Sequence, residues 1–258
     1  FIGLWHLGCV YSNVIAEMTK SQIIAFDRDS LNIHNLNQKI PPVYEPGLEK
    51  LIISNLANKK IQFTDKLKKI NSCEIVWITI DTELEENSDS GKYELVLEEI
   101  YKTIMFMQNN ATLIVSSQIP INSYDLIKKK LEQLLRNDIK IVFNPENLRL
   151  GSSISYLRNP DRLIFGIEEE SKKLISSIFP NNYPLFFVEP KTALLTKHVI
   201  NSFLATSVVF ANEIGSIAKK FGVNTFELTK SVKSDERIGK KAYLQPGEAY
   251  GGGTLGRD

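Results

Sequence analysis

Short apolar runs alternate with longer amphipathic stretches over the first 188 residues, and this alternation constrains the fold more than any other feature of the sequence. Repeated strand–helix–strand units connect by right-handed crossovers and build a mostly parallel sheet with helices on both faces. The sequence therefore predicts an α/β fold with a doubly wound, Rossmann-type sheet. The expected strands are Phe1–Leu4, Gln22–Phe26, Ile75–Ile80, Thr112–Ser116, Ile139–Phe143, Leu163–Gly166 and Leu185–Val188, and the expected helices are Gly8–Met18, Ser30–Asn37 (capped by Ser30), Tyr93–Met107 and Tyr124–Leu135.

The pattern changes after residue 188, where only helical periodicity follows. We therefore expect a domain boundary near Glu189, with a nucleotide-binding domain at 1–188 and a helical domain at 189–258. The segment Thr192–Phe221 has apolar residues at helical spacing and more apolar surface than one small sheet can cover, which predicts a homodimer through this helix. The chain begins in a strand without Met and ends just after a glycine-rich run, so we read it as a piece of a longer protein.

Composition excludes several classes of function. The net charge is +1, so no nucleic-acid partner is expected. No run of about eighteen apolar residues occurs, and we therefore expect no membrane span. The cysteines, Cys9 and Cys73, lie in apolar contexts that fit a reducing, cytoplasmic location, and no His/Cys cluster indicates a metal site.

The segment Gly3–Gly8 lies where a dinucleotide fingerprint belongs, between the first strand and the first helix. Its second glycine is replaced by Trp5, whose indole would crowd the phosphates unless the loop or the cofactor shifts. Asp27 follows Gly8 by nineteen residues at the end of the next strand, where a carboxylate accepts ribose hydroxyls and favours NAD over NADP, although Arg28 next to it weakens that preference. The alternative is a doubly wound domain that has lost its dinucleotide. His6, inside this loop, is interpreted as a packing or backbone-bonding residue.

Lys197 and Asn201 stand four residues apart, so they project from one face of a helix. Such a pair can act on one bound hydroxyl, because the lysine can relay a proton while the amide fixes the oxygen. The alternative is a solvated lysine beside a helix-interior asparagine. His198 is one step further round the helix and should face elsewhere.

Six segments, in order along the chain, resemble the UDP-glucose/GDP-mannose dehydrogenases. The first, Pro41–Leu48, reads PPVYEPGL and is similar to the family's PIYEPGL. The others are Asn144–Leu148 with Asn159–Arg162 (NPEFL…NPDR in the family), Lys197–Ala205 (KxxxNxFLA), Phe210–Glu213 (FANE), Asp235–Gly239 and Gly251–Asp258. The resemblance covers essentially the whole chain.

The resemblance implies an N-terminal NAD domain, a helical middle domain used for dimerisation, and a C-terminal nucleotide-sugar domain that this chain lacks. Typical members oxidise a sugar C6 alcohol to a carboxylate by two hydride transfers, through an aldehyde and a cysteine-bound thioester. By position, Glu146 would be the acid/base residue near the thioester step, Lys197 and Asn201 would act on the C6 oxygen and a water, and Asp258 would assist them. The residues placed at the substrate are Glu146, Asn147, Leu148, Lys197, Asn201, Arg237 (across a dimer interface), Leu244, Tyr250 and Gly251, and those at NAD are Gly3, Trp5, His6, Leu7, Gly8, Asp27, Asp81, Thr82, Gln118 and Glu146.

The sequence departs from the family at the end of this chain. Where the family reads GFGGSCFPKD, residues 249–258 read AYGGGTLGRD, which puts Thr254 at the catalytic cysteine. A threonine hydroxyl needs strong base activation before it can add to an aldehyde, whereas a cysteine is partly thiolate near neutral pH. Further changes at Trp5, Asp81, Thr82 and Gln118 fall where the family touches NAD. Glu146, Lys197, Asn201 and Asp258 are nevertheless present, which favours altered chemistry over lost chemistry.

We therefore expect NAD-dependent oxidation of a nucleotide-linked sugar by a single hydride transfer that stops at the carbonyl. A variant keeps the full oxidation, with water activated by Lys197 or Asp258 in place of the cysteine. The alternative is a catalytically silent, dimeric nucleotide- or sugar-binding protein of the same fold, which Trp5 and Thr254 motivate. A third hypothesis, a β-hydroxyacid dehydrogenase, also pairs a lysine with an asparagine, but Pro41–Leu48 and Asn144–Leu148 speak against it.

Overall fold

The computed structural model describes residues 1–82, 92–146 and 148–247, and this part of the chain forms two compact units that divide between Leu195 and Thr196. The helices of the first unit are α1 (His6–Met18), α2 (Ser30–Asn37), α3 (Leu48–Ala57), α4 (Tyr93–Ile104), α5 (Ser123–Gln133), α6 (Ser153–Arg158) and α7 (Lys172–Ile178), with 3₁₀ turns at Leu67–Ser72 and Glu169–Ser171. Its strands are β1 (Ile23–Phe26), β2 (Ile61–Thr64), β3 (Ile75–Ile78), β4 (Thr112–Val115), β5 (Lys140–Phe143), β6 (Leu163–Gly166) and β7 (Leu185–Val188).

The strands of the first unit form a doubly wound, mostly parallel sheet, as the sequence predicts. β1 pairs with β2, while β3 to β7 form a five-stranded sheet in which only the β5–β6 pair is antiparallel. Ile2 forms parallel bridges to Phe26 on one side and to Ile78 on the other, and so joins the two sets of strands. The expected strand Phe1–Leu4 is thus a single bridging residue at the centre of the sheet. The chain winds outward from it first to β1 and β2 and then, on the other side, to β3 and β4.

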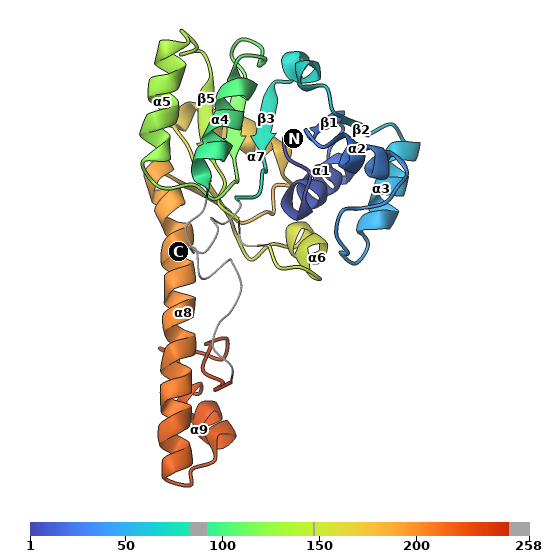
Figure 1. Cartoon of the computed structure of the whole chain (residues 1–258). Coiled ribbons are helices and arrows are strands. Elements are labelled where there is room, and N and C mark those ends of the chain that lie inside the picture. Colours follow the sequence, from blue (N-terminus) through green and yellow to red (C-terminus); the bar gives the residue numbers. More distant parts are fainter. Residues whose placement is uncertain (83–91, 147, 248–258) are drawn as a thin grey trace. The chain divides into compact units, whose positions relative to one another are not determined.

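Apolar residues from both faces of the sheet form two separate cores. One core packs α1, α2, α3 and α7 against side chains such as Trp77, Ile114 and Val142. The other packs α4 and α5 against the alternate residues of the same strands, among them Val76 and Leu113. In Figure 1, α4 and α5 lie beside each other, apart from α1, α2 and α3. Residues that alternate along one strand therefore serve opposite faces, which explains why these strands read as continuous apolar runs.

Some elements differ from those expected. Asp29, and not Ser30, caps α2, because its carboxylate accepts the backbone N–H of Leu31 at 2.9 Å while Ser30 is already helical. Sequence reasoning missed α3, β2, α6 and α7 in this unit, and α9 (Thr225–Val232) in the second. Each of these elements has at most ten residues, too few for a periodic pattern to stand out.

The second unit holds most of α8 (Pro190–Lys220) together with α9. The helix expected at Thr192–Phe221 is thus confirmed, two residues longer at its start and one shorter at its end. By length and composition α8 is long and apolar enough to cross a membrane, a property that the sequence analysis did not expect of any segment. One such helix is weak evidence for a membrane, since core helices of water-soluble proteins meet the same requirements.

Candidate active site

The residues expected at the cofactor follow the carboxyl ends of neighbouring parallel strands. Gly3 follows the bridging residue Ile2, Asp27 follows β1, Asp81 and Thr82 follow β3, and Gln118 follows β4. Ile2 lies where the winding of the sheet reverses, and in open α/β sheets ligands bind in the crevice at this point. The topology therefore brings these predicted residues to one edge of the sheet.

Gly3 and Gly8 occupy positions that no other residue fits. Gly3 has a φ of +91°, and a Cβ there would lie 2.8 Å from Cα of Ile80. A Cβ on Gly8 would overlap the carbonyl oxygen of Gly3 and would lie 2.7 Å from Oγ1 of Thr79. Thr79 itself donates to that carbonyl at 2.8 Å. The first glycine thus permits the turn and the last one permits α1 to approach the sheet, the two roles expected in a dinucleotide loop.

Trp5 is the N-terminal cap residue of α1, and its side chain makes no capping hydrogen bond. The residue is 50% exposed, so the indole is not packed into the core. The first turn of α1 therefore presents backbone N–H groups and the positive end of the helix dipole, the usual partners of a pyrophosphate. Together with the two glycines, this end of α1 fits the phosphates of a dinucleotide.

Asp27 lies beside this loop and helps to hold it. Its Oδ2 accepts the backbone N–H of Leu4 at 2.7 Å, and its Oδ1 accepts that of Asp29 at 2.9 Å. Oδ2 also accepts the side-chain amide of Asn32 at 3.4 Å, and Oδ1 has room for a second donor. The carboxylate thus fixes the loop and retains the acceptor capacity for the ribose hydroxyls that the sequence analysis assigned to it.

His6 binds side chains from the loop before α3 and from the first residue of α6. Its Nε2 lies 3.0 Å from Oε2 of Glu45 and 3.1 Å from Oγ of Ser153. Glu45 also accepts the backbone N–H groups of Gly151 (2.8 Å) and Ser153 (2.9 Å), so both oxygens of its buried carboxylate are hydrogen-bonded. The interpretation of His6 as a packing or backbone-bonding residue is thus changed in one respect, because the partners of its ring are side chains and not backbone groups. Because both contacts use one ring nitrogen, this Ser–His–Glu group is a structural link and not a nucleophilic relay.

The Glu45 link predicts a pH-dependent stability difference. Burial acts to raise the pKa of Glu45, but the N–H groups of Gly151 and Ser153 together with His6 outweigh it and hold the pKa below its ordinary value. Glu45→Gln should lower the free energy of unfolding by about 1–3 kcal/mol at pH 7, since an amide cannot accept at both oxygen positions. A lowered folded-state pKa stabilises above the unfolded value of about 4.3, so this difference should shrink as pH falls through the folded pKa.

Urea unfolding of both proteins across a pH series measures this difference. Glu132→Gln, which neutralises an exposed carboxylate on α5, is the matched control and should change stability by less than about 0.5 kcal/mol. If the difference in free energy of unfolding between the wild type and Glu45→Gln stayed constant down to pH 3, the effect could not be assigned to an ionised Glu45.

The loops that follow β3 and β4 are held together at the same edge of the sheet. Thr82 donates its hydroxyl to the carbonyl of Gln118 at 2.7 Å, and Ser117 donates to the carbonyl of Ile80 at 2.7 Å. Thr82 is buried. Thr82 and Gln118, which both differ from the family pattern, are therefore hydrogen-bonded to each other. The sequence analysis did not predict this contact.

Glu146 follows β5 at this edge and accepts a hydrogen bond from the hydroxyl of Tyr11 at 3.1 Å. Leu148 is half-buried and packs against the core that holds α1. Asn147, between them, lies outside the described residues. The sequence analysis missed Tyr11, because a tyrosine on the apolar face of α1 reads as an ordinary core residue.

In the second unit, Lys197 and Asn201 lie one turn apart on α8. Asn201 is 3% exposed, as the alternative of a helix-interior asparagine also expects, and Lys197 is half-buried. Arg237 is exposed and holds Asp235 through two hydrogen bonds, at 3.0 and 2.6 Å. The carbonyl of Leu244 accepts the hydroxyl of Thr229 at 3.3 Å.

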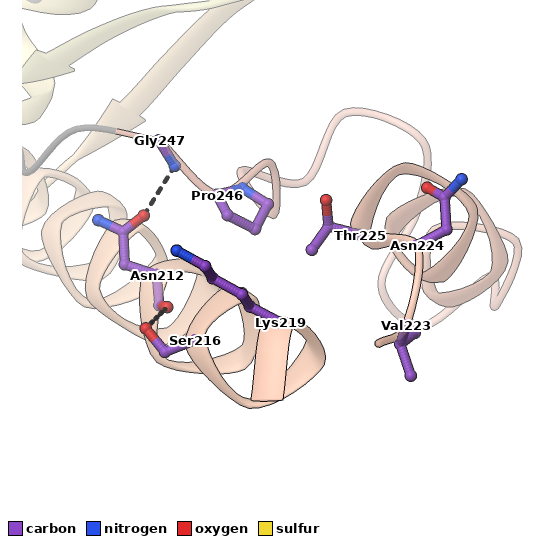
Figure 2. Close-up of a pocket in the computed structure, with 9 residues that line it drawn as sticks. Asn212, Ser216, Lys219, Val223, Asn224, Thr225, Pro246 and Gly247 are labelled. Carbon is purple, nitrogen blue, oxygen red and sulfur yellow. Dashed lines mark hydrogen bonds between the residues drawn. The ribbon is translucent and has the colours of Figure 1, made fainter. Parts of the chain in front are cut away.

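An open hollow of about 610 Å³ lies between α8, the start of α9 and the segment around Pro246 (Figure 2). Asn212 accepts the backbone N–H of Gly247 at 2.9 Å, and Gly215 leaves room for the ring of Pro246. Lys219 extends along one side. The hollow thus adjoins the beginning of the predicted sugar loop Leu244–Tyr250, and its helical wall was not predicted as a site. Tyr250, Gly251, Thr254 and Asp258 lie outside the described residues.

The fold and the glycine loop define a dinucleotide-binding protein of the doubly wound class. Residues 1–182 match the NAD binding domain of the UDP-glucose/GDP-mannose dehydrogenase family, and residues 191–258 match the central domain of the same family. The chain therefore belongs to the UDP-glucose/GDP-mannose dehydrogenase family, whose members bind NAD and nucleotide sugars. This assignment removes the hypothesis of a β-hydroxyacid dehydrogenase.

Several relatives that align with this chain are named UDP-glucose dehydrogenases. The whole chain aligns with the UDP-glucose 6-dehydrogenase of Rhizobium meliloti at 28% identity and with that of Rickettsia bellii at 30% identity, covering 60% of each. The solved UDP-glucose dehydrogenase of Pyrobaculum islandicum superposes with a TM-score of 0.88 at 24% identity, over 98% of this chain and 60% of that one. The chain thus spans about 60% of the length of the relatives it matches.

Proposed function

We propose that the protein containing this chain is an NAD-dependent dehydrogenase that oxidises an alcohol of a nucleotide-linked sugar. The observation that carries the proposal is the glycine loop at the reversal point of the sheet, where the Gly3 turn, the uncapped end of α1 and Asp27 together fit a dinucleotide. Family membership supplies the class of substrate. When bound there, NAD would accept the hydride that the sugar alcohol loses.

Gly3, Gly8 and Asp27 would hold the cofactor, with Trp5, His6, Leu7, Asp81, Thr82 and Gln118 around it. On the substrate side, Lys197 would take the proton of the reacting hydroxyl and Asn201 would hold its oxygen. Asp258 would assist the lysine, and Glu146 would hold a water or a ring hydroxyl. Asn147, Leu148, Leu244, Tyr250 and Gly251 would line the sugar pocket, and Arg237 would contact the sugar nucleotide.

We further propose that the reaction stops after one hydride transfer. Thr254 motivates this step of the proposal, because it stands in the sequence where the family pattern has its cysteine, and its hydroxyl is a poor nucleophile toward an aldehyde. Without a covalent intermediate, the carbonyl product would be released or would be oxidised only as its hydrate.

Counting NADH per sugar consumed tests the proposal. The full-length protein would be presented with UDP-, GDP- and TDP-linked sugars while absorbance is followed at 340 nm. One NADH per sugar and a carbonyl product are expected. Two NADH and a carboxylate would contradict the single transfer and show that water replaces the cysteine. No NADH with intact ligand binding would favour the silent binding protein, for which the exposed Trp5 in the phosphate loop is the motivating observation.

Dimerisation through α8 is part of the same proposal. The helix exposes large apolar residues along most of its length, including Val199, Phe203, Phe210 and Ile217. Exposed apolar surface of this extent on one helix is typical of an interface between copies. Light scattering of the full-length protein should give twice the mass of one chain, and a monomeric mass at micromolar concentration would remove this part of the proposal.

A further inference from the structure

A buried chain of hydrogen bonds runs from the middle of the sheet to Glu146. Trp77 on β3 donates its indole N–H to Oγ of Ser116 at 2.8 Å, and Ser116 donates to Oδ1 of Asn144 at 3.2 Å. Nδ2 of Asn144 donates to the carbonyl of Ile164 at 2.9 Å, which orients the amide. Trp77, Ser116 and Asn144 are all at most 2% exposed. The amide oxygen of Asn144 is therefore fixed in place and already has one donor.

Tyr11 on α1 reaches the same point from the other side. Its side chain is fully buried, and its ring lies 5.1 Å from that of Trp77. Its hydroxyl lies 3.1 Å from Oδ1 of Asn144 and 3.1 Å from Oε2 of Glu146. A phenol has one proton to donate, so it can serve only one of these two acceptors at a time. Ser116 already donates to Asn144, and a hydrogen bond to a carboxylate is stronger than one to an amide oxygen, so the proton of Tyr11 is better placed on Glu146 when Glu146 is ionised.

We propose that Tyr11 is a positioning residue for Glu146, and that its hydroxyl follows the ionisation of that carboxyl group. When Glu146 is a carboxylate, Tyr11 donates to it in a charge-assisted bond. When Glu146 gains a proton, it can donate to the oxygen of Tyr11, whose own proton then turns to Asn144. Both arrangements satisfy every group, because the oxygen of Asn144 has two acceptor sites.

The functional part of this inference rests on the proposed function, in which Glu146 belongs to the active site. An acid/base residue must stay in place in both of its protonation states. A carboxyl group held by a single fixed donor would lose that partner on protonation. Tyr11 remains protonated throughout, since burial, followed by the charge of Glu146, raises its pKa well above the ordinary value. Tyr156 also lies within electrostatic range of Tyr11 and Glu146, but burial raises the pKa of Tyr156 to about 12, so this phenol stays neutral over the acidic pH range; the other charged groups that influence Tyr156 are Arg162 and Asp161.

A double-mutant cycle in the full-length protein tests the contact without relying on activity. Tyr11→Phe keeps the ring against Trp77 and removes the hydroxyl, while Glu146→Met keeps length and removes the acceptor. Urea unfolding at pH 7 gives the unfolding equilibrium constant of each protein. The double variant should raise this constant roughly tenfold less than the product of the two single-variant effects. Additive effects, within about twofold, would overturn the proposal, whether or not the protein proves to be a dehydrogenase.

The second readout separates positioning from mere structural support. With a sugar nucleotide that is turned over, Tyr11→Phe should move the acidic limb of the pH profile of kcat to higher pH, because the carboxylate form of Glu146 loses the charge-assisted bond from Tyr11 while the carboxyl form loses less. KM for the sugar nucleotide should stay unchanged. Tyr156→Phe, which removes a neighbouring hydroxyl that bonds the carbonyl of Arg162, is the matched control and should leave the profile in place. An unmoved acidic limb in Tyr11→Phe would overturn the role, whereas absent turnover in the wild type would contradict the proposed function and leave the stability cycle to decide on the contact.

Discussion

Replacing Gly8 by alanine is expected to abolish NAD binding and to lower the free energy of unfolding by about 3 kcal/mol. The new methyl group would overlap the carbonyl oxygen of Gly3 and meet Oγ1 of Thr79, and both are held by the hydrogen bond between them. Neither is the flexible end of a long side chain, so relief requires α1 to move away from the sheet. That movement would displace the N–H groups that are proposed to bind the pyrophosphate.

Urea unfolding and calorimetric titration with NAD measure the two effects. Gly247→Ala is the matched control, because no atom of the described residues beyond its chain neighbours lies within 4 Å of the position of its Cβ, and it should change stability by less than about 0.5 kcal/mol. NAD at about 100 times its dissociation constant should stabilise the wild type by about 2.7 kcal/mol and the Gly8→Ala protein by nothing measurable. Full NAD affinity in Gly8→Ala would mean that the cofactor does not depend on this approach of α1 to the sheet.

The sheet and the nucleotide loop could be predicted from sequence because they depend on local patterns. Buried parallel strands are continuously apolar, and the Gly3–Gly8 segment followed by Asp27 has a spacing that the βαβ unit imposes. The loop departs from the usual pattern at Trp5, and the sequence alone led us to expect crowding there. In the structure Trp5 is half exposed at the N-terminal cap of α1. Its exposure depends on the direction of its side chain, which the spacing of residues in the sequence does not determine.

The contacts that hold the candidate site together could not be predicted in the same way. His6 meets Glu45 across 39 residues of sequence, and Tyr11 meets Glu146 across 135. Such pairs arise from the packing of α1 against loops at the sheet edge, and a histidine or a tyrosine in a helix carries no local sign of its partner. The helix cap shows the same limit on a small scale, since Asp29 and Ser30 are both good caps and only the backbone angles decide between them.

Lys197→Met is expected to lower kcat by about 10²–10⁴-fold while leaving the affinity for NAD unchanged. Lys197 and Asn201 lie one turn apart on α8, and the burial of Asn201 gives the pair an environment in which a lysine and an amide can share one oxygen of a substrate. Methionine keeps the length and the apolar stem of the lysine, so the change removes the amine with little loss of packing. Steady-state kinetics with the sugar nucleotide that gives the most NADH measures the loss.

Lys191→Met, on the first turn of the same helix, is the matched control. Lys191 pairs with Asp125 at 2.8 Å, and both side chains are about half exposed, so losing this pair should cost less than about 1 kcal/mol and should not alter kcat. A Lys197→Met protein that kept its kcat would show that another group takes the hydroxyl proton, and it would move the search to Glu146 and Asp258. A rise in KM with kcat unchanged would show that the lysine binds the sugar equally in the ground state and the transition state, because only interactions that strengthen in the transition state raise kcat.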